Sequence, residues 1–516
     1  MKFSLNYSAI VAAAAVHFHF TTSFTVNAFA QSSHLPKVTR ISKLGSAAVI
    51  EEVDEAIIDA PSLGSVEQQQ VKNDDRNKLL PPTPGIQENS LFKCDDNVEY
   101  WSNFQLNGQW SAQDNLAEMA NISRRFTASG DADKIAYWLK HVGRSGYFFT
   151  NAALGSIASG LHERFIANNN DDNVENKNGI LPFNMNSSIA TRLLLEAFIC
   201  YEQDYEKIND GTYKQPWDME VGNRQSSPIN VITSTSRFVN EAIGTLARRN
   251  RQTEKDRSIW ITNDASPNLY PKYYQTAFHY QTDGWMSQRS ANVYETSTET
   301  LFLGRQDAMQ RSALGPIIDY SKTFQMKSSS NDGEPLKVLE VACGTGRFMT
   351  FIRDGLPLDT ECTAVDLSPF YLDKARDNDA YYRKEACRKQ NLDRDTIQPL
   401  RLVQANAEEL PFEDESFDVV VCVYLYHELP REARANVSAE MSRVLKKGGL
   451  LSFADSIQRG DRPALDAYIG NFEKMNEPYY VDYTEDDLPG QFMKEGLKPM
   501  DKSVRSTTKS LSFIKE

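Results

Sequence analysis

The stretch Leu336-Lys-Val-Leu-Glu-Val-Ala-Cys-Gly-Thr-Gly-Arg-Phe348 decides the fold of this chain. It begins as an apolar, β-prone run, passes through a Gly-x-Gly turn and continues directly into a segment that favours helix. Glycines at such a turn let backbone N–H groups approach a ligand at the amino end of a helix. A second short strand, Cys362-Thr-Ala-Val-Asp366, ends in a carboxylate about 20 residues later, where nucleotide-binding α/β folds place their ribose acceptor. Together the two features predict a site for a ligand that contains adenosine.

Strand-like and helix-like segments alternate from residue 336 to the end of the chain. The patterns predict strands near 336–342, 361–366, 400–405, 417–424 and 449–455, and helices near 346–354, 369–389, 431–446 and 461–475. Such alternation is typical of a parallel sheet with helices on both faces, with ligands bound at the carboxyl ends of the strands. We therefore predict a doubly wound, Rossmann-like α/β fold.

A turn that binds a dinucleotide is one interpretation of the Gly-x-Gly sequence. That fingerprint reads Gly-x-Gly-x-x-Gly, and its third glycine allows close packing of helix on strand. Gly344 and Gly346 fill the first two positions, but Met349 occupies the third. A nicotinamide-dependent oxidoreductase is therefore a second hypothesis, and Met349 weighs against it.

Four ordered blocks give a more specific resemblance: Leu339–Gly346, Gln404–Phe412, Ser416–Tyr424 and Leu445–Leu450. On these blocks the chain resembles class I S-adenosylmethionine-dependent methyltransferases, and within them the subgroup that includes ubiquinone and menaquinone biosynthesis enzymes. The resemblance covers roughly residues 335–516. It implies a seven-stranded sheet that ends in an antiparallel pair, S-adenosyl-L-methionine as cofactor, and methyl transfer to a small apolar or aromatic acceptor.

The resemblance also implies the cofactor-binding residues. They are Glu340, Ala342, Cys343, Gly344, Thr345, Gly346, Asp366, Leu367, Asn406, Ala407 and Val423. Asp366 would receive the ribose diol, unless it caps the next helix, a role that Ser368 could fill instead. Glu340 would meet the ammonium group, directly or through water, because a carboxylate in an apolar strand needs a partner. Relatives usually carry Asp where this chain has Asn406, and frequently Gly where it has Ala342.

Catalytic residues are harder to predict from the sequence. Methyl transfer from a sulfonium is a direct displacement, so much of the rate can come from positioning, and a base is needed only for a nucleophile whose proton has a high pKa. His427 follows the fourth predicted strand of the domain and is the best base candidate, with Tyr426 or Glu428 as its orienting partner. The alternative is that His427 caps a helix or packs under the loop. His279 is a weaker candidate.

Composition limits the classes of partner. Of 516 residues, 40% are hydrophobic and 10% aromatic, and no apolar run of 18 residues predicts a membrane span. The net charge of −14 argues against nucleic acid, which requires a basic surface. The six cysteines lack metal-ligand spacing, so we expect free thiols and no metal site.

The amino terminus has the composition of a targeting segment. No acidic residue precedes Glu51, a short apolar core spans residues 9–20, and a basic, Ser-containing stretch spans 31–50. This order, with Ala28-Phe-Ala30 between the two parts, is similar to the bipartite presequence of algae with secondary plastids. We expect residues 1–50 to be a plastid presequence, with a secretory signal or a mitochondrial presequence as alternatives.

Three further regions precede the α/β segment. Residues 51–92 are polar and Pro-rich and predict a disordered linker, 93–250 predict a helical accessory domain, and 251–334 predict lid or connecting helices before the methyltransferase-like domain at 335–516. Aromatic residues of the lid region would either pack the core or line a substrate pocket: Tyr273, Tyr274, Phe278, Tyr280, Trp285, Tyr294 and Phe302. The large helical region motivates a third hypothesis, a binding or assembly protein without chemistry that uses this region for a protein partner. A protein methyltransferase is an intermediate hypothesis, between an enzyme that methylates small molecules and a binding protein without chemistry.

Overall fold

The computed structural model describes residues 83–106, 111–167, 187–219, 228–251, 269–328, 333–393 and 396–516. The predicted presequence, 1–50, and residues 51–82 of the predicted linker lie outside the described residues. The chain from Thr83 to Glu516 forms one compact unit. Among the described helices, none is long and apolar enough to cross a membrane.

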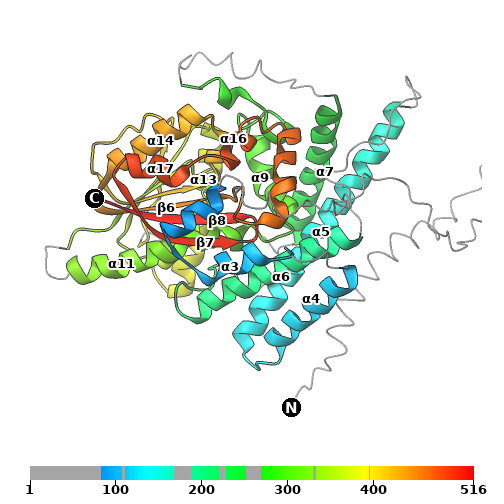
Figure 1. Cartoon of the computed structure of the whole chain (residues 1–516), viewed down its shortest axis with the longest axis horizontal. Helices are drawn as coiled ribbons and strands as arrows, with labels where there is room; N and C mark the ends of the chain where they lie inside the picture. The colour runs from blue at the N-terminus through cyan, green and yellow to red at the C-terminus, as the bar shows by residue number, and fades with distance from the viewer. Residues whose placement is uncertain are drawn as a thin grey trace, which may run out of the picture. The chain divides into compact units, whose positions relative to one another are not determined.

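The centre of this unit is an eight-stranded sheet, part of which is visible in Figure 1 as β6, β7 and β8. The strands lie in the order β1-β7-β8-β6-β5-β2-β3-β4. Their bounds are β1 Lys93–Cys94, β2 Lys337–Val341, β3 Glu361–Asp366, β4 Arg401–Gln404, β5 Phe417–Val423, β6 Leu445–Ser456, β7 Leu497–Arg505 and β8 Thr508–Lys515. All five strands predicted from the alternation, and the two at the carboxyl end, are confirmed.

Strand directions define where a ligand can bind. β4, β3, β2, β5 and β6 run parallel, whereas β8 is antiparallel to both β6 and β7. The chain leaves β2 toward β3 on one side and returns as β5 on the other. This reversal of direction opens a crevice at the carboxyl ends of β2 and β5, where ligands bind in open α/β sheets.

Helices cover both faces of the sheet and continue beyond one edge. The α-helices are α2 Pro84–Gln87, α3 Asp96–Asn103, α4 Ala112–Thr127, α5 Ala132–Ala167, α6 Ser187–Asn209, α7 Pro228–Arg251, α9 Gln288–Leu301, α10 Gln306–Gln310, α11 Leu314–Ser328, α12 Arg347–Gly355, α13 Pro369–Gln390, α14 Arg431–Val444, α15 Asp466–Ile469, α16 Tyr480–Thr484 and α17 Leu488–Lys494. Short 3₁₀ turns are η1 Glu88–Ser90, η3 Tyr273–Gln275, η4 Phe278–Tyr280, η5 Arg311–Ala313, η6 Tyr426–Glu428, η7 Pro463–Leu465 and η8 Gly470–Met475.

Side chains of the central strands alternate between the two faces of the sheet, and each face packs against its own layer of helices. Val419 and Val421 of β5 belong to the apolar cluster under α11, α12 and α13, whereas Val420 and Cys422 belong to the cluster under α14 and α17. All four are fully buried. Successive side chains of a strand point to opposite faces, so a parallel strand buried on both sides reads as a continuous apolar run.

The helical region packs directly against the sheet. One apolar cluster contains Trp101, Tyr137 and Cys200 of the helical region. It also contains Ile457, directly after β6, and Val504 of β7. Figure 1 shows α3 and α6 beside β7. The helices of residues 93–250 therefore belong to the same packing unit as the sheet, which differs from the separate accessory domain that the sequence predicts.

A buried carboxylate joins the two parts. Asp204 of α6 accepts hydrogen bonds from the Tyr137 and Tyr213 hydroxyls, at 2.5 Å and 2.8 Å, and pairs with Arg311 and Arg505 at 2.5 Å and 3.0 Å. Removing one member of such a buried group leaves an uncompensated charge, which makes the contact costly to break.

The predicted linker ends earlier than residue 92. Residues 84–90 form α2 and η1, and the buried carboxylate of Glu88 lies 2.7 Å from the ammonium groups of Lys502 and Lys509. β1 then pairs in parallel with β7 and adds an eighth strand to the seven that the resemblance implies. The polar composition of this segment concealed its burial because its charges are neutralised by residues more than 400 positions away.

Candidate functional site

The glycine turn after β2 brings backbone to the crevice. Gly344 and Gly346 adopt φ of +55° and +69°, and the backbone N–H of Gly344 donates to Oδ2 of Asp366 at 2.8 Å. A Cβ added at Gly346 would lie 3.0 Å from Cβ of Ala375 in α13, so this glycine allows close packing of two helices. Ala342 adopts φ of +57°, the left-handed region that favours glycine. The turn is therefore built with an alanine in a strained backbone conformation.

Asp366 ends β3 at the floor of a small cavity of about 100 Å³. Its Oδ1 accepts from the backbone N–H of Ser368 at 2.8 Å, and burial raises the pKa of the carboxyl to about 6 despite these backbone hydrogen bonds. Ser368 itself caps α13, because its side chain accepts from the backbone of Tyr371. Asp366 is thus left to face the cavity, together with the predicted residues Leu367, Asn406 and Ala407.

Asn406 has a structural contact that the sequence analysis did not predict. Its Oδ1 accepts from the backbone N–H of Glu408 at 3.1 Å, which stabilises the turn after β4. The side chain still lines the small cavity, so its amide remains accessible to a ligand edge.

Aromatic side chains from residues 269–301 close the small cavity. Tyr273, Tyr274, Phe278, Trp285 and Tyr294 all line it, and Phe278 stacks on Trp285 with ring centroids 4.8 Å apart. Phe302 instead packs against the cluster of the helical region. Both alternatives given by the sequence therefore hold, each for different aromatic residues. The backbone of this cover is left-handed at His279, Tyr280 and Asp283, a concentration of strain that is typical of ligand-binding segments.

Glu340 lies buried in β2 and faces a second, larger cavity. Burial, with Asp366 nearby, raises the pKa of this carboxyl to about 8, although a backbone hydrogen bond from Met349 opposes the shift. Its Oε2 atom has no hydrogen-bond partner. A buried, unpaired carboxylate oxygen is costly unless a ligand donates to it. Glu340 therefore fits a ligand ammonium group.

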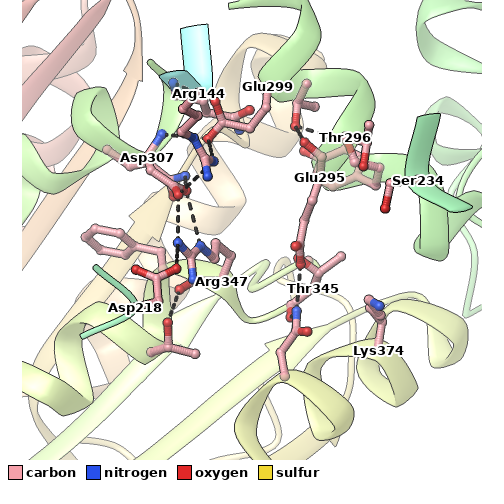
Figure 2. Close-up of a pocket in the computed structure, with 18 of the residues that line it drawn as sticks. Arg144, Asp218, Ser234, Glu295, Thr296, Glu299, Asp307, Thr345, Arg347 and Lys374 are labelled. Atoms are coloured by element: carbon pink, nitrogen blue, oxygen red, sulfur yellow. Dashed lines mark hydrogen bonds and ion pairs between the residues drawn. The ribbon is translucent and has the colours of Figure 1, made fainter. Parts of the chain in front are cut away.

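The larger cavity has a volume of about 500 Å³ and adjoins the small one. Ala342, Gly344, Tyr294 and Tyr424 line both. Cys343, Thr345 and Val423, three further predicted residues, line the larger cavity only. Its opposite walls come from α5, α7, α9 and α10, which Figure 2 shows around the open space above the glycine turn.

A network of buried charges forms one wall of the larger cavity (Figure 2). Arg347, the residue directly after the glycine turn, pairs with Asp218 at 2.8 Å and with Asp307 at 2.7 Å. Arg144 of α5 pairs with the same Asp307 at 3.0 Å and with Glu299 at 2.6 Å. We call these five residues the ion-pair network. Sequence patterns did not point to them, because they come from five separate segments.

His427 lies in η6, after β5, and is buried. Its Nδ1 is 2.5 Å from Oδ1 of Asp455. The other carboxylate oxygen, Oδ2, accepts from the backbone N–H of Tyr426. Burial lowers the pKa of an imidazole, but the charge of Asp455 and its hydrogen bond raise the pKa of His427 to about 10. The ring is therefore protonated near pH 7. A protonated imidazole has no lone pair to accept a proton, so this arrangement does not suit the predicted base.

Tyr426, predicted as a possible partner in catalysis, packs in the core of the domain. Its hydroxyl is fully buried, 2.8 Å from Oγ of Ser438, and its ring packs on Phe453 and Phe492 under α14 and α17. Tyr426 lines neither cavity. Tyr426 lies in the apolar core, whereas Glu428, two residues later in the same 3₁₀ turn, lines the small cavity.

Glu428, His279 and Glu477 surround His427. Burial raises the pKa values of Glu428 and Glu477 to about 8, and burial lowers the pKa of His279 to about 4. Nδ1 of His279 lies 3.0 Å from Oε1 of Glu477. His279, the weaker base candidate, is thus neutral but faces a carboxyl group rather than either cavity.

Comparison with known proteins agrees with this geometry. Residues 338–449 match the family model described as a methyltransferase domain. The chain carries a methyltransferase domain. It is 27% identical over 145 residues to the uncharacterised methyltransferase YcgJ of Bacillus subtilis, covering 28% of this chain and 50% of that protein. It is 30% identical over 123 residues to demethylmenaquinone methyltransferase of Staphylococcus aureus, covering 24% of this chain and 44% of the enzyme.

The crystal structure of B. subtilis YcgJ is 21% identical, with a TM-score of 0.26, and the match covers 37% of this chain and 69% of that one. The chain spans about half the length of these curated relatives. The methyltransferase domain contains the glycine turn, Asp366, Asn406 and His427, whereas α5, α7, α9 and α10 lie outside the matched residues.

The two cavities together fit S-adenosyl-L-methionine. A carboxylate for the ribose diol and an aromatic cover face the small cavity. An orphan carboxylate oxygen for an ammonium group, and the amino end of α12 for a carboxylate, face the larger one. The cofactor of the domain is therefore S-adenosyl-L-methionine.

Proposed function

We propose that this protein transfers a methyl group from S-adenosyl-L-methionine to a small acceptor molecule. The single observation that carries the proposal is the pair of connected cavities over the glycine turn. Asp366 faces one cavity, and the unpartnered Oε2 of Glu340 lies at the wall of the other. A ligand with a ribose at one end and an ammonium group at the other spans both.

The cofactor supplies an electrophilic methyl group on a sulfonium, and the chain would supply position. Ala342, Gly344, Tyr294 and Tyr424 line both cavities, so the junction between them would hold the sulfonium. Methyl transfer gains much of its rate from holding nucleophile, carbon and sulfur in line.

Isothermal titration calorimetry tests the proposal. S-adenosylmethionine and S-adenosylhomocysteine are expected to bind, whereas reduced nicotinamide dinucleotide is not. Asp366→Asn is expected to weaken binding by about tenfold or more, since a charge-assisted hydrogen bond contributes about 1.5–3 kcal/mol. Asp377→Asn, on the exposed face of α13, is the matched control and should bind normally. An Asp366 variant with unchanged affinity would contradict the proposed site.

We further propose that the first 50 residues direct the protein to a plastid. Their lack of acidic residues and the order of apolar core and basic segment support this. A fluorescent fusion of residues 1–82 expressed in an alga with secondary plastids tests it, and accumulation in mitochondria would favour the alternative.

A further inference from the structure

The larger cavity has more room than the amino-acid end of the cofactor needs. Its volume of about 500 Å³ lies in the range of complete ligand pockets, about 300–1,000 Å³. It begins at the junction with the small cavity and extends away from the glycine turn to α7 and α9. A molecule in its outer part would lie next to the sulfonium that the proposed function places at the junction.

Several polar side chains line this outer part. Figure 2 shows Ser234 of α7, Glu295 and Thr296 of α9 and Lys374 of α13 around one side of the open space, facing the ion-pair network on the other. Lys374 is 8% exposed and lies 3.4 Å from Oδ1 of Asn292. These groups include hydrogen-bond donors, acceptors and charges of both signs.

Glu295 is held in place at the rim of the glycine turn. Nδ2 of Asn378 lies 2.6 Å from its Oε1 and also donates to the backbone oxygen of Thr345 at 2.9 Å. One amide therefore ties α9 and α13 to the turn, which fixes a carboxylate between the cofactor end and the outer part of the cavity. On the opposite wall, Oε1 of buried Gln306 has no hydrogen-bond partner. A polar ligand would satisfy groups that an apolar one would leave unpaired.

From this geometry we propose that the larger cavity is the methyl-acceptor site and that it accepts a hydrophilic, water-soluble molecule. The inference rests on the proposed function and replaces the apolar or aromatic acceptor expected from the sequence. An apolar acceptor in the outer part would leave the Oε1 atom of Gln306 without a partner, at a cost of about 1–3 kcal/mol. The helices α5, α7, α9 and α10 would then set acceptor specificity.

A labelling experiment distinguishes the two acceptor classes. The full chain is incubated with S-adenosylmethionine that carries a labelled methyl group and with a cell extract split into an aqueous and a chloroform-soluble fraction. We expect at least tenfold more label transferred to small molecules of the aqueous fraction. Transfer to the lipid fraction, or to neither, overturns the inference.

Two variants locate the acceptor. Ser234→Trp and Val231→Trp would each fill the outer part of the larger cavity. Each should reduce methyl transfer to the acceptor by tenfold or more and leave the affinity for S-adenosylhomocysteine unchanged. Ile232 lies on the same helix and is 69% exposed, so Ile232→Trp is the control. It should transfer labelled methyl groups as the unsubstituted chain does. Normal labelling by both blocked variants would place the acceptor elsewhere.

The two proposals fail in different ways. Absence of S-adenosylhomocysteine binding to the unsubstituted chain would refute the proposed function. Normal binding with transfer only to lipids would leave that function intact and refute the hydrophilic acceptor.

Discussion

The Nδ1 atom of His427 lies 2.5 Å from Oδ1 of Asp455, and both residues are buried. The imidazolium of His427 thus forms an ion pair with Asp455, and this pair favours the protonated histidine in the folded state. The histidine that the sequence suggested as a base is better suited to hold the loop after β5 by electrostatic attraction.

The pair predicts a pH-dependent stability. Because the folded pKa of His427 is raised to about 10, its contribution is fully present below about pH 6.5 and is lost as the pH rises through about 10. His427→Gln is expected to cost about 3 kcal/mol at pH 6.5 and much less at pH 10. Urea denaturation at both pH values measures this.

His279→Gln is the control, because the stability contributed by His279 changes with pH in the opposite direction. Its folded pKa is lowered to about 4, so its contribution is present above about pH 6.5 and lost as the pH falls through about 4. His279→Gln should therefore flatten the acid side of the stability profile and leave the alkaline side unchanged. Equal pH profiles for both variants would contradict the assignment.

Glu340 predicts a trade between stability and binding. Burial raises its folded pKa to about 8, so the stability that its carboxyl contributes is lost as the pH rises from about 4.5 to about 8. Glu340→Gln is expected to stabilise the ligand-free protein at pH 8, by at most about 4 kcal/mol, and to weaken S-adenosylmethionine binding at least tenfold. Thermal unfolding and calorimetry at pH 6 and pH 8 check both. A variant that binds normally would remove Glu340 from the ammonium site.

Ala342 predicts a stabilising substitution to glycine. Its φ of +57° costs about 1–2 kcal/mol for a residue with a Cβ. Ala342→Gly should recover up to about 1 kcal/mol, after the entropy lost by glycine on folding, without loss of cofactor affinity. Ala364→Gly in β3, the same chemical change in an extended strand, is the control and should destabilise the protein by a similar amount. Denaturant midpoints compare the two.

The ion-pair network predicts a selective effect on one end of the cofactor. Asp307→Asn would remove the carboxylate shared by Arg144 and Arg347 and loosen the residue that follows the glycine turn. We expect S-adenosylhomocysteine to bind about tenfold more weakly, a change of about 1.4 kcal/mol, and adenosine to bind normally. Glu385→Gln, which removes the carboxylate of a surface ion pair with the exposed Arg388 on α13, is the control. Equal losses for both ligands would indicate general destabilisation instead.

The local features of the domain could be predicted from the sequence because they depend on neighbours in the chain. The apolar runs of β2, β3 and β5, the Gly-x-Gly turn and the carboxylate at the end of β3 carry their own periodicity and turn chemistry. These signals determined the Rossmann-like fold. The resemblance to methyltransferases added the residues expected to bind the cofactor, and ten of them line the two cavities: Glu340, Ala342, Cys343, Gly344, Thr345, Asp366, Leu367, Asn406, Ala407 and Val423.

Tertiary structure alone decided which distant side chains meet. Asp455 reaches His427 across 28 residues, and Asp218 reaches Arg347 across 129. Neither pairing has a sequence signature, since each depends on how strands and helices pack rather than on local spacing. The protonation of His427, the inward turn of Tyr426 and the helical walls of the larger cavity follow from that packing. The sequence by itself therefore determined the sheet and its glycine turn, and the packing of the helices determined what surrounds that turn.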